Sequence, residues 1–125
     1  MRTLWQRLEQ FFAAQQWPVA LRPGASEADI AAAETALGLA FPADFRASLR
    51  IHDGEDRQQW RQCVRWMIND SFLLSLDEIL SHWNLQQTYF AKWGEEFGDE
   101  CHDQERIRNV IFHPRRIPIA NGLDE

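Results

Sequence analysis

The sequence has few of the residues that build metal centres, disulfide frameworks or membrane anchors. Only Cys63 and Cys101 occur among its 125 residues, far apart and outside any C-x-x-C spacing. Neither a zinc site nor a set of disulfides is therefore expected. No apolar run approaches the roughly 20 residues of a membrane-spanning helix, and no signal peptide is visible. We expect a cytoplasmic protein that holds no metal or cofactor and does not enter a membrane.

Positive charge is also scarce. Thirteen Lys and Arg residues stand against 19 Asp and Glu residues, which gives a net charge of −6. This balance argues against non-specific nucleic-acid binding, because such binding needs a basic face that displaces counterions. It is common in ordinary proteins and also suits a basic protein partner. Large aromatic residues are frequent, with six Trp and eight Phe, and 45% of the chain is hydrophobic. This composition predicts a single globular domain over residues 1–125.

No set of residues in the sequence makes a complete catalytic site. His52 and Asp53 form a pair of the kind that binds metal in some phosphohydrolases, but Gly54 follows at once. We interpret the pair as a helix-terminal histidine beside a turn aspartate. Cys101 and His102 are adjacent, and neighbouring side chains on a helix cannot all face one metal ion. Phosphate-binding glycine loops, serine nucleophile elbows and dinucleotide fingerprints are not found. A binding protein is expected rather than an enzyme.

Helical patterns dominate the first half of the chain. The apolar residues Leu4, Leu8, Phe11 and Phe12 recur at helical spacing, which predicts an amphipathic helix ending near Trp17. The six tryptophans include two, Trp5 and Trp83, that lie close to apolar helical faces and are expected in the core.

Two further helices are predicted between residues 26 and 53. Ser26 suits the N-cap of the first, and Gly38 suits the left-handed position that ends it. Its buried face is expected to consist of Ile30, Ala33 and Leu37. Pro42 is a plausible first residue of the next helix, in which Phe45 and Leu49 lie one turn apart.

The second half mixes strands with one long helix. A short apolar strand is predicted at 71–74, and Ser75 with Glu78 then forms a capping box at the start of a helix. That helix extends to about Gly94 and places Ile79, Trp83, Gln86 and Phe90 along one face. Strands are expected at 62–68, 109–112 and 117–120, with Pro118 at an edge. The predicted fold class is α+β, with N-terminal helices packed on a mainly antiparallel sheet that the 77–93 helix crosses.

Several short blocks resemble, in order and spacing, the Smi/Knr cell-wall-regulator family of the SUKH superfamily. Most blocks are in the first half: Glu34, Leu37-Gly38, Phe41-Pro42, Asp44-Phe45-Arg46 and His52-Asp53-Gly54. The later ones are Leu73–Ile79, Phe112-His113-Pro114 and Ile117–Ala120. The resemblance implies a SUKH-like fold and a non-enzymatic, protein-binding function. Bacterial members of the family are mostly thought to be immunity proteins against polymorphic toxins, and fungal members regulate or scaffold cell-wall signalling.

The sequence departs from the family at its C-terminal end. Family domains normally continue beyond the block ending at Ala120 into further strands, whereas this sequence has five more residues. We therefore expect a sheet shortened at its C-terminus, and a homodimer through the exposed edge is a hypothesis. Arg116 also stands where the family usually has a tryptophan.

Acidic residues supply the candidate contact surface. The stretch from Glu95 to Glu105 is either a solvated face or a patch that meets a basic toxin, such as a nuclease. Under the second interpretation the predicted partner-binding residues are Asp53, Glu55, Asp56, Trp60, Glu95, Glu96, Asp99 and Glu100. The favoured function is an immunity protein that binds and neutralises a toxin. The alternative is an adaptor or regulatory scaffold related to cell-wall synthesis.

Overall fold

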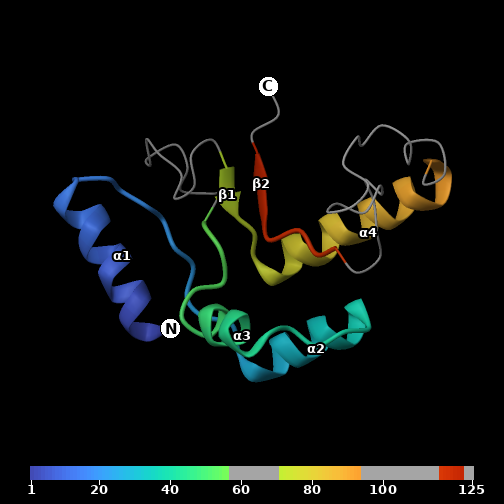
Figure 1. Cartoon of the computed structure of the whole chain (residues 1–125), viewed down its shortest axis with the longest axis horizontal. Coiled ribbons are helices and arrows are strands. Elements are labelled where there is room, and N and C mark those ends of the chain that lie inside the picture. Colours follow the sequence, from blue (N-terminus) through green and yellow to red (C-terminus); the bar gives the residue numbers. More distant parts are fainter. Residues whose placement is uncertain (57–70, 94–115, 123–125) are drawn as a thin grey trace, which may run out of the picture.

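The computed structural model describes residues 1–56, 71–93 and 116–122. In chain order, the elements of these residues are α1 (Arg2–Ala14), α2 (Glu27–Leu37), α3 (Ala43–Leu49), β1 (Ser71–Leu73), α4 (Leu76–Trp93) and β2 (Ala120–Gly122). Figure 1 shows α2 and α3 on one side of the two strands, α4 running away from them, and α1 standing apart. The predicted α+β class is confirmed.

Both ends of α2 follow from the sequence. The Ser26 hydroxyl accepts a hydrogen bond from the backbone N–H of Asp29 at 3.1 Å, which satisfies one of the free donors at the helix start. Gly38 ends the helix with φ of +67°, the left-handed conformation that glycine adopts without penalty. Ile30, Ala33 and Leu37 are buried on the face that meets α4, as the spacing predicts.

The predicted capping box at the start of α4 is also confirmed. The Ser75 N–H donates to the Glu78 carboxylate at 2.9 Å, and the Glu78 N–H donates to the Ser75 hydroxyl at 3.4 Å. Asp53 adds a further acceptor, since its Oδ1 lies 2.8 Å from the backbone nitrogen of Leu76. The start of α4 is therefore fixed both by its own residues and by the segment that follows α3.

The two strands pair antiparallel, with Phe72 opposite Asn121. The expected strand at 117–120 is wrong in its bounds, because β2 begins at Ala120 and ends at Gly122. Pro118 has no N–H to donate, so regular pairing cannot extend through it; just beyond it, the Ile119 carbonyl accepts from the Leu74 N–H at 3.0 Å. The other strand predictions, at 62–68 and 109–112, lie outside the described residues.

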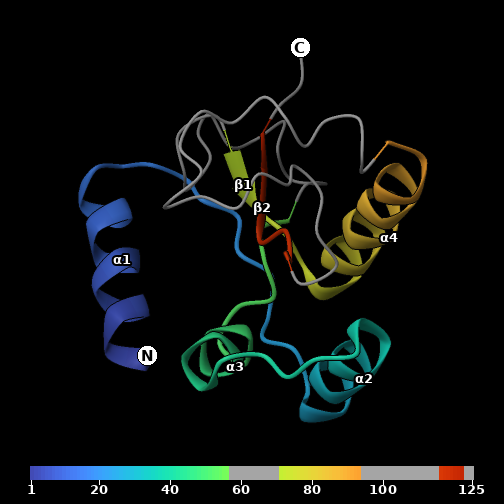
Figure 2. The ribbon, with the colours of Figure 1, turned by 45° about the vertical axis from the view of Figure 1, so that its right-hand side comes forward.

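One hydrophobic core joins α2, β1 and α4. It brings together residues that the sequence separates by up to 49 positions, namely Ile30, Ala33, Leu37, Phe41, Leu49, Phe72, Leu74, Leu76 and Ile79. Figure 2 shows β1 beside β2, with α1 and α4 on either side and α2 and α3 below. This core holds the segments that line the site described below.

Helix α1 forms where it is predicted but ends at Ala14 and buries a different face. Trp5 and Phe12 are buried, as expected for Trp5, whereas Leu4, Leu8 and Phe11 are exposed. Trp5 fixes the orientation of the helix, because its indole N–H donates to the Ser48 hydroxyl of α3 at 2.9 Å. The spacing could not distinguish the two faces, since apolar residues cover both.

Candidate functional site

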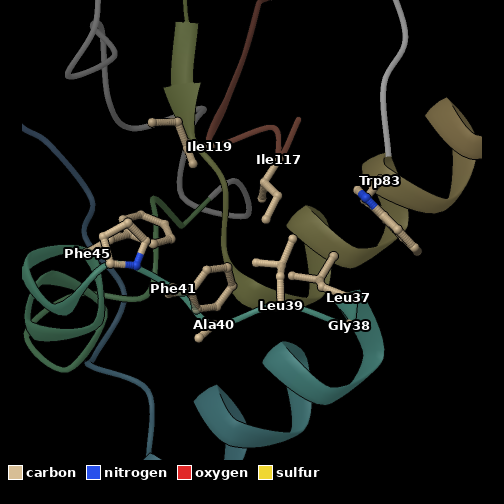
Figure 3. A pocket seen from close by; sticks show the side chains of 10 residues that line it. Leu37, Gly38, Leu39, Ala40, Phe41, Phe45, Trp83, Ile117 and Ile119 are labelled. Carbon is tan, nitrogen blue, oxygen red and sulfur yellow. The ribbon is translucent and has the colours of Figure 1, made fainter. Parts of the chain in front are cut away.

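An apolar pocket of about 810 Å³ opens between the end of α2, helix α3, helix α4 and the segment before β2. Figure 3 shows side chains from all four elements turned toward this common space. The lining residues are Leu37, Gly38, Leu39, Ala40, Phe41, Pro42, Phe45, Trp83, Ile117 and Ile119. None of them carries a charge, so the pocket suits apolar groups rather than acid–base chemistry.

The floor and the rim of the pocket differ in burial. Leu37 and Phe41 form the floor and belong to the hydrophobic core. Phe45, Trp83 and Ile117 are only partly buried against that core, and Ile119 is half exposed. An apolar rim that remains accessible to water gains free energy when a partner covers it. The geometry therefore favours an apolar side chain, or a short apolar segment of a partner, as the occupant.

Glu34 holds the chain in the conformation that shapes this pocket. Its Oε1 accepts a hydrogen bond from the Phe41 N–H at 2.7 Å, and its Oε2 pairs with the guanidinium of Arg46. Arg46 also pairs with Glu27 at 2.7 Å, so this one residue of α3 joins α3 to two positions of α2. The N–H of Phe41, more than the neighbouring Arg46, lowers the pKa of the Glu34 carboxyl despite its partial burial.

Asp53, one of the predicted partner-binding residues, has a structural role. Its carboxylate accepts from the Leu76 N–H, close to the positive end of the α4 dipole. Desolvation nevertheless raises the pKa of the Asp53 carboxyl above its ordinary value of 3.8, while the Leu76 hydrogen bond and Arg22 act in the opposite direction. A carboxylate engaged in this way positions α4.

Glu55 is not a surface residue, which corrects our expectation that it faces a partner. Only 2% of the residue is exposed. Its carboxylate accepts from the Leu73 N–H at 3.0 Å, and its own N–H donates to the Leu73 carbonyl at 2.9 Å. Glu55 therefore satisfies both backbone hydrogen-bonding groups of Leu73 in β1, as a residue of a neighbouring strand would. Its carboxylate points into the protein to accept one of these bonds.

The other predicted contact residues do not form a described patch. Asp56 is partly buried, and its N–H donates to the Ala20 carbonyl at 2.7 Å. Trp60, Glu95, Glu96, Asp99 and Glu100 lie outside the described residues. The acidic surface therefore stays a prediction.

His52 connects α1 with the loop that follows α3. Its Nε2 lies 2.7 Å from the Glu9 carboxylate and its Nδ1 lies 3.1 Å from the Arg22 carbonyl. The Trp5 ring meets the imidazole edge-on, with ring centroids 4.7 Å apart. These contacts agree with a structural role. Among the described residues no three His, Cys, Asp or Glu side chains come together to hold a metal, and Cys101, His102 and Asp103 lie outside them.

The structural role of Asp53 leads to a first prediction. Asp53→Ala removes an acceptor at the helix start and is expected to lower the free energy of unfolding by about 1 kcal/mol. Asp53→Asn keeps an oxygen acceptor and removes the charge, so we expect no loss at pH 7. Urea unfolding, followed by tryptophan fluorescence, measures both variants.

The pH dependence of the same variants tests the cause. Because the folded-state pKa of Asp53 lies above 3.8, its proton-linked stabilisation is complete below pH 3.8 and lost as the pH rises through the folded-state pKa. Asp53→Asn should therefore gain stability relative to the wild type as the pH rises through this range. A gain in the opposite direction would show that ionisation of Asp53 stabilises the fold.

The sequence predicts the pocket residues only as parts of helices or of the family pattern, and not as a pocket. Leu37, Phe41 and Ile117 all lie in blocks of that pattern. One signal for the site is the cluster of apolar residues around Pro42 and around Pro118. A proline interrupts regular secondary structure, so apolar side chains next to it can stay accessible. Nothing in the sequence shows that these two segments meet.

The fold is that of a small α+β domain with an open apolar pocket. By sequence, this chain belongs to the SMI1 / KNR4 family (SUKH-1), which matches residues 24–125. No curated protein matches the sequence at a significant level. The family is generally non-enzymatic and is associated with protein–protein interaction. Within the described parts of the chain, no helix has the length and hydropathy needed to cross a bilayer.

Proposed function

We propose that this protein is a cytoplasmic immunity protein that binds a cognate bacterial toxin and neutralises it without catalysis. The observation that carries the proposal is the open apolar pocket, lined by blocks that define the family resemblance. Family membership supports an immunity or cell-wall-related role. In the proposed mechanism an apolar anchor of the toxin enters the pocket, and the bound protein covers the toxin's active site.

The predicted acidic surface would raise the rate at which the protein meets the toxin, whereas the pocket would hold the toxin once it is bound. With a net charge of −6, the protein would be steered toward a basic toxin such as a nuclease, which raises the association rate. Charge reversal of Glu95, Glu96, Asp99 and Glu100 is expected to slow association and to reduce its salt dependence. A homodimer through an exposed sheet edge is compatible with this mechanism.

An adaptor or regulatory scaffold in cell-wall synthesis signalling is the second candidate. The same pocket favours it, since a hydrophobic anchor site serves any protein partner. The two functions differ in what they predict for cells. An immunity protein binds one dominant partner that carries a toxin domain and rescues cells that express it, whereas a scaffold binds several partners and protects against none.

The decisive experiment combines affinity capture from the native host, with mass spectrometry, and a growth-rescue assay against the captured toxin. Ile119→Glu places a charge on the exposed rim of the pocket, and we expect it to weaken toxin binding by about tenfold or more and to abolish rescue. Calorimetry with the purified pair measures the affinity.

A matched control uses another exposed apolar residue outside the pocket. Leu85 of α4 is 48% exposed, compared with 51% for Ile119. Leu85→Glu should leave both binding and rescue unchanged, and both variants should melt within a few degrees of the wild type. Equal binding by Ile119→Glu and the wild type would remove the pocket from the interface; a captured toxin with no rescue would contradict the immunity function.

A further inference from the structure

Helix α1 carries a second apolar surface, separate from the pocket. Its members are Met1, Leu4, Leu8 and Phe11, with 40%, 52%, 41% and 50% of each residue exposed. We call this surface the α1 seam. It lies in the part of the chain that precedes the family match at residues 24–125. The seam therefore lies outside the matched residues, and the function proposed from the pocket does not use it.

The spacing within the seam indicates what can cover it. Its members are separated by three, four and three residues, the alternation with which one helix packs against another in a coiled coil. Trp5 and Phe12 follow the seam residues Leu4 and Phe11 along the chain and are buried, so one flank of the seam faces the body of the domain. The other flank remains open to a partner helix.

Arg7 gives this open flank its charge. Arg7 directly precedes the seam residue Leu8. In a coiled coil, the residue at this flanking position forms salt bridges with the neighbouring helix. Arg7 is exposed and takes part in no ion pair found among the described residues. The nearby Glu9 does not neutralise the charge of Arg7, because the Glu9 carboxylate pairs with His52. An acidic residue on the incoming helix would complement this site.

A second copy of the chain fits the seam less well. In an antiparallel pair of seams the two Arg7 side chains would lie on the same side and repel each other. In a parallel pair Arg7 would face Phe12 of the other copy, which is buried against its own domain. Neither arrangement gives Arg7 a partner of opposite charge.

We propose that the α1 seam docks an amphipathic helix of a partner protein, whose apolar face is flanked by acidic side chains opposite Arg7. The interaction is independent of the pocket and of toxin neutralisation. It would give this protein a second binding surface in addition to the pocket.

The test uses two synthetic peptides of about three heptads, with leucine at the seam positions and either glutamate or lysine at the flanking positions. We expect the acidic peptide to bind the full chain and the basic peptide to bind at least several-fold more weakly. Leu8→Gln should weaken the acidic peptide by about tenfold, and Arg7→Glu should reverse the preference between the peptides. Titration by calorimetry measures the affinities, and Leu85→Gln is the control.

Four results would overturn the proposal. Absence of acidic-peptide binding, or equal binding of both peptides by the wild type, would show that no charged helix is recognised. A dimer that Leu8→Gln dissociates in sedimentation would identify a second copy as the occupant. Binding to anionic lipid vesicles that depends on Leu8, without peptide binding, would identify a membrane surface instead. Because the seam is exposed, Leu4→Gln serves as a second variant if Leu8→Gln melts early.

Discussion

Gly54→Ala is expected to destabilise the protein by about 3 kcal/mol, because strain and steric overlap both act at this position. Gly54 has φ of +74°, which side chains with a Cβ rarely adopt. An added methyl group would lie 2.5 Å from the backbone nitrogen of Ser75 and 2.6 Å from the carbonyl carbon of Leu74. Both neighbours are backbone atoms next to the α4 capping box, so neither can move without disturbing the start of that helix.

Gly38→Ala provides the matched control for this prediction. Gly38 has a similar φ of +67°, but nothing lies within 4 Å of the position that a Cβ would take. Only the backbone strain remains, so the expected loss is about 1 kcal/mol. Urea unfolding of both variants separates the steric part from the strain. Equal losses would mean that Gly54 does not approach Leu74 and Ser75 as closely as the structure shows.

The boundaries of α2 and α4 could be predicted because each is set by residues close in sequence. Ser26 and Ser75 begin their helices through hydrogen bonds that reach only three residues ahead, and Gly38 ends α2 through its own conformation. Such local rules are independent of the rest of the fold. The α+β class followed because these helices alternate with short apolar strands.

The pocket and the burial of Glu55 could not be predicted, because both depend on segments that are distant in sequence. Ile117 reaches the pocket beside Leu39 from the other end of the chain. Glu55 stands among other acidic residues and looks like part of a surface, yet its carboxylate pairs with the Leu73 N–H. A hydrogen bond across eighteen residues leaves no periodic signal. For α1 the sequence indicated that Trp5 is buried but not that Leu4 is exposed, since both residues are apolar.

The long-range contacts that the sequence does not reveal should also carry most of the stability. Phe72 is the largest fully buried side chain of the described residues, with 1% exposed, and it belongs to the cluster that joins Ile30 of α2 and Ile79 of α4. Phe72→Ala should lower the free energy of unfolding by about 4 kcal/mol through lost burial and a cavity. For a domain of this size the melting temperature would fall by about 15 °C.

Two further variants decide whether this loss reflects the core. Phe72→Leu keeps most of the apolar volume and should cost about 1–2 kcal/mol, whereas Leu85→Ala at an exposed site of α4 should change stability by about 0.5 kcal/mol or less. Calorimetric melting gives all three values. A graded loss in this order would mean that β1 holds α2 and α4 together, and therefore holds the two sides of the pocket. If Phe72→Ala melted like Leu85→Ala, β1 would not be what holds α2 and α4 together, and the pocket between them would not be the fixed anchor site proposed above.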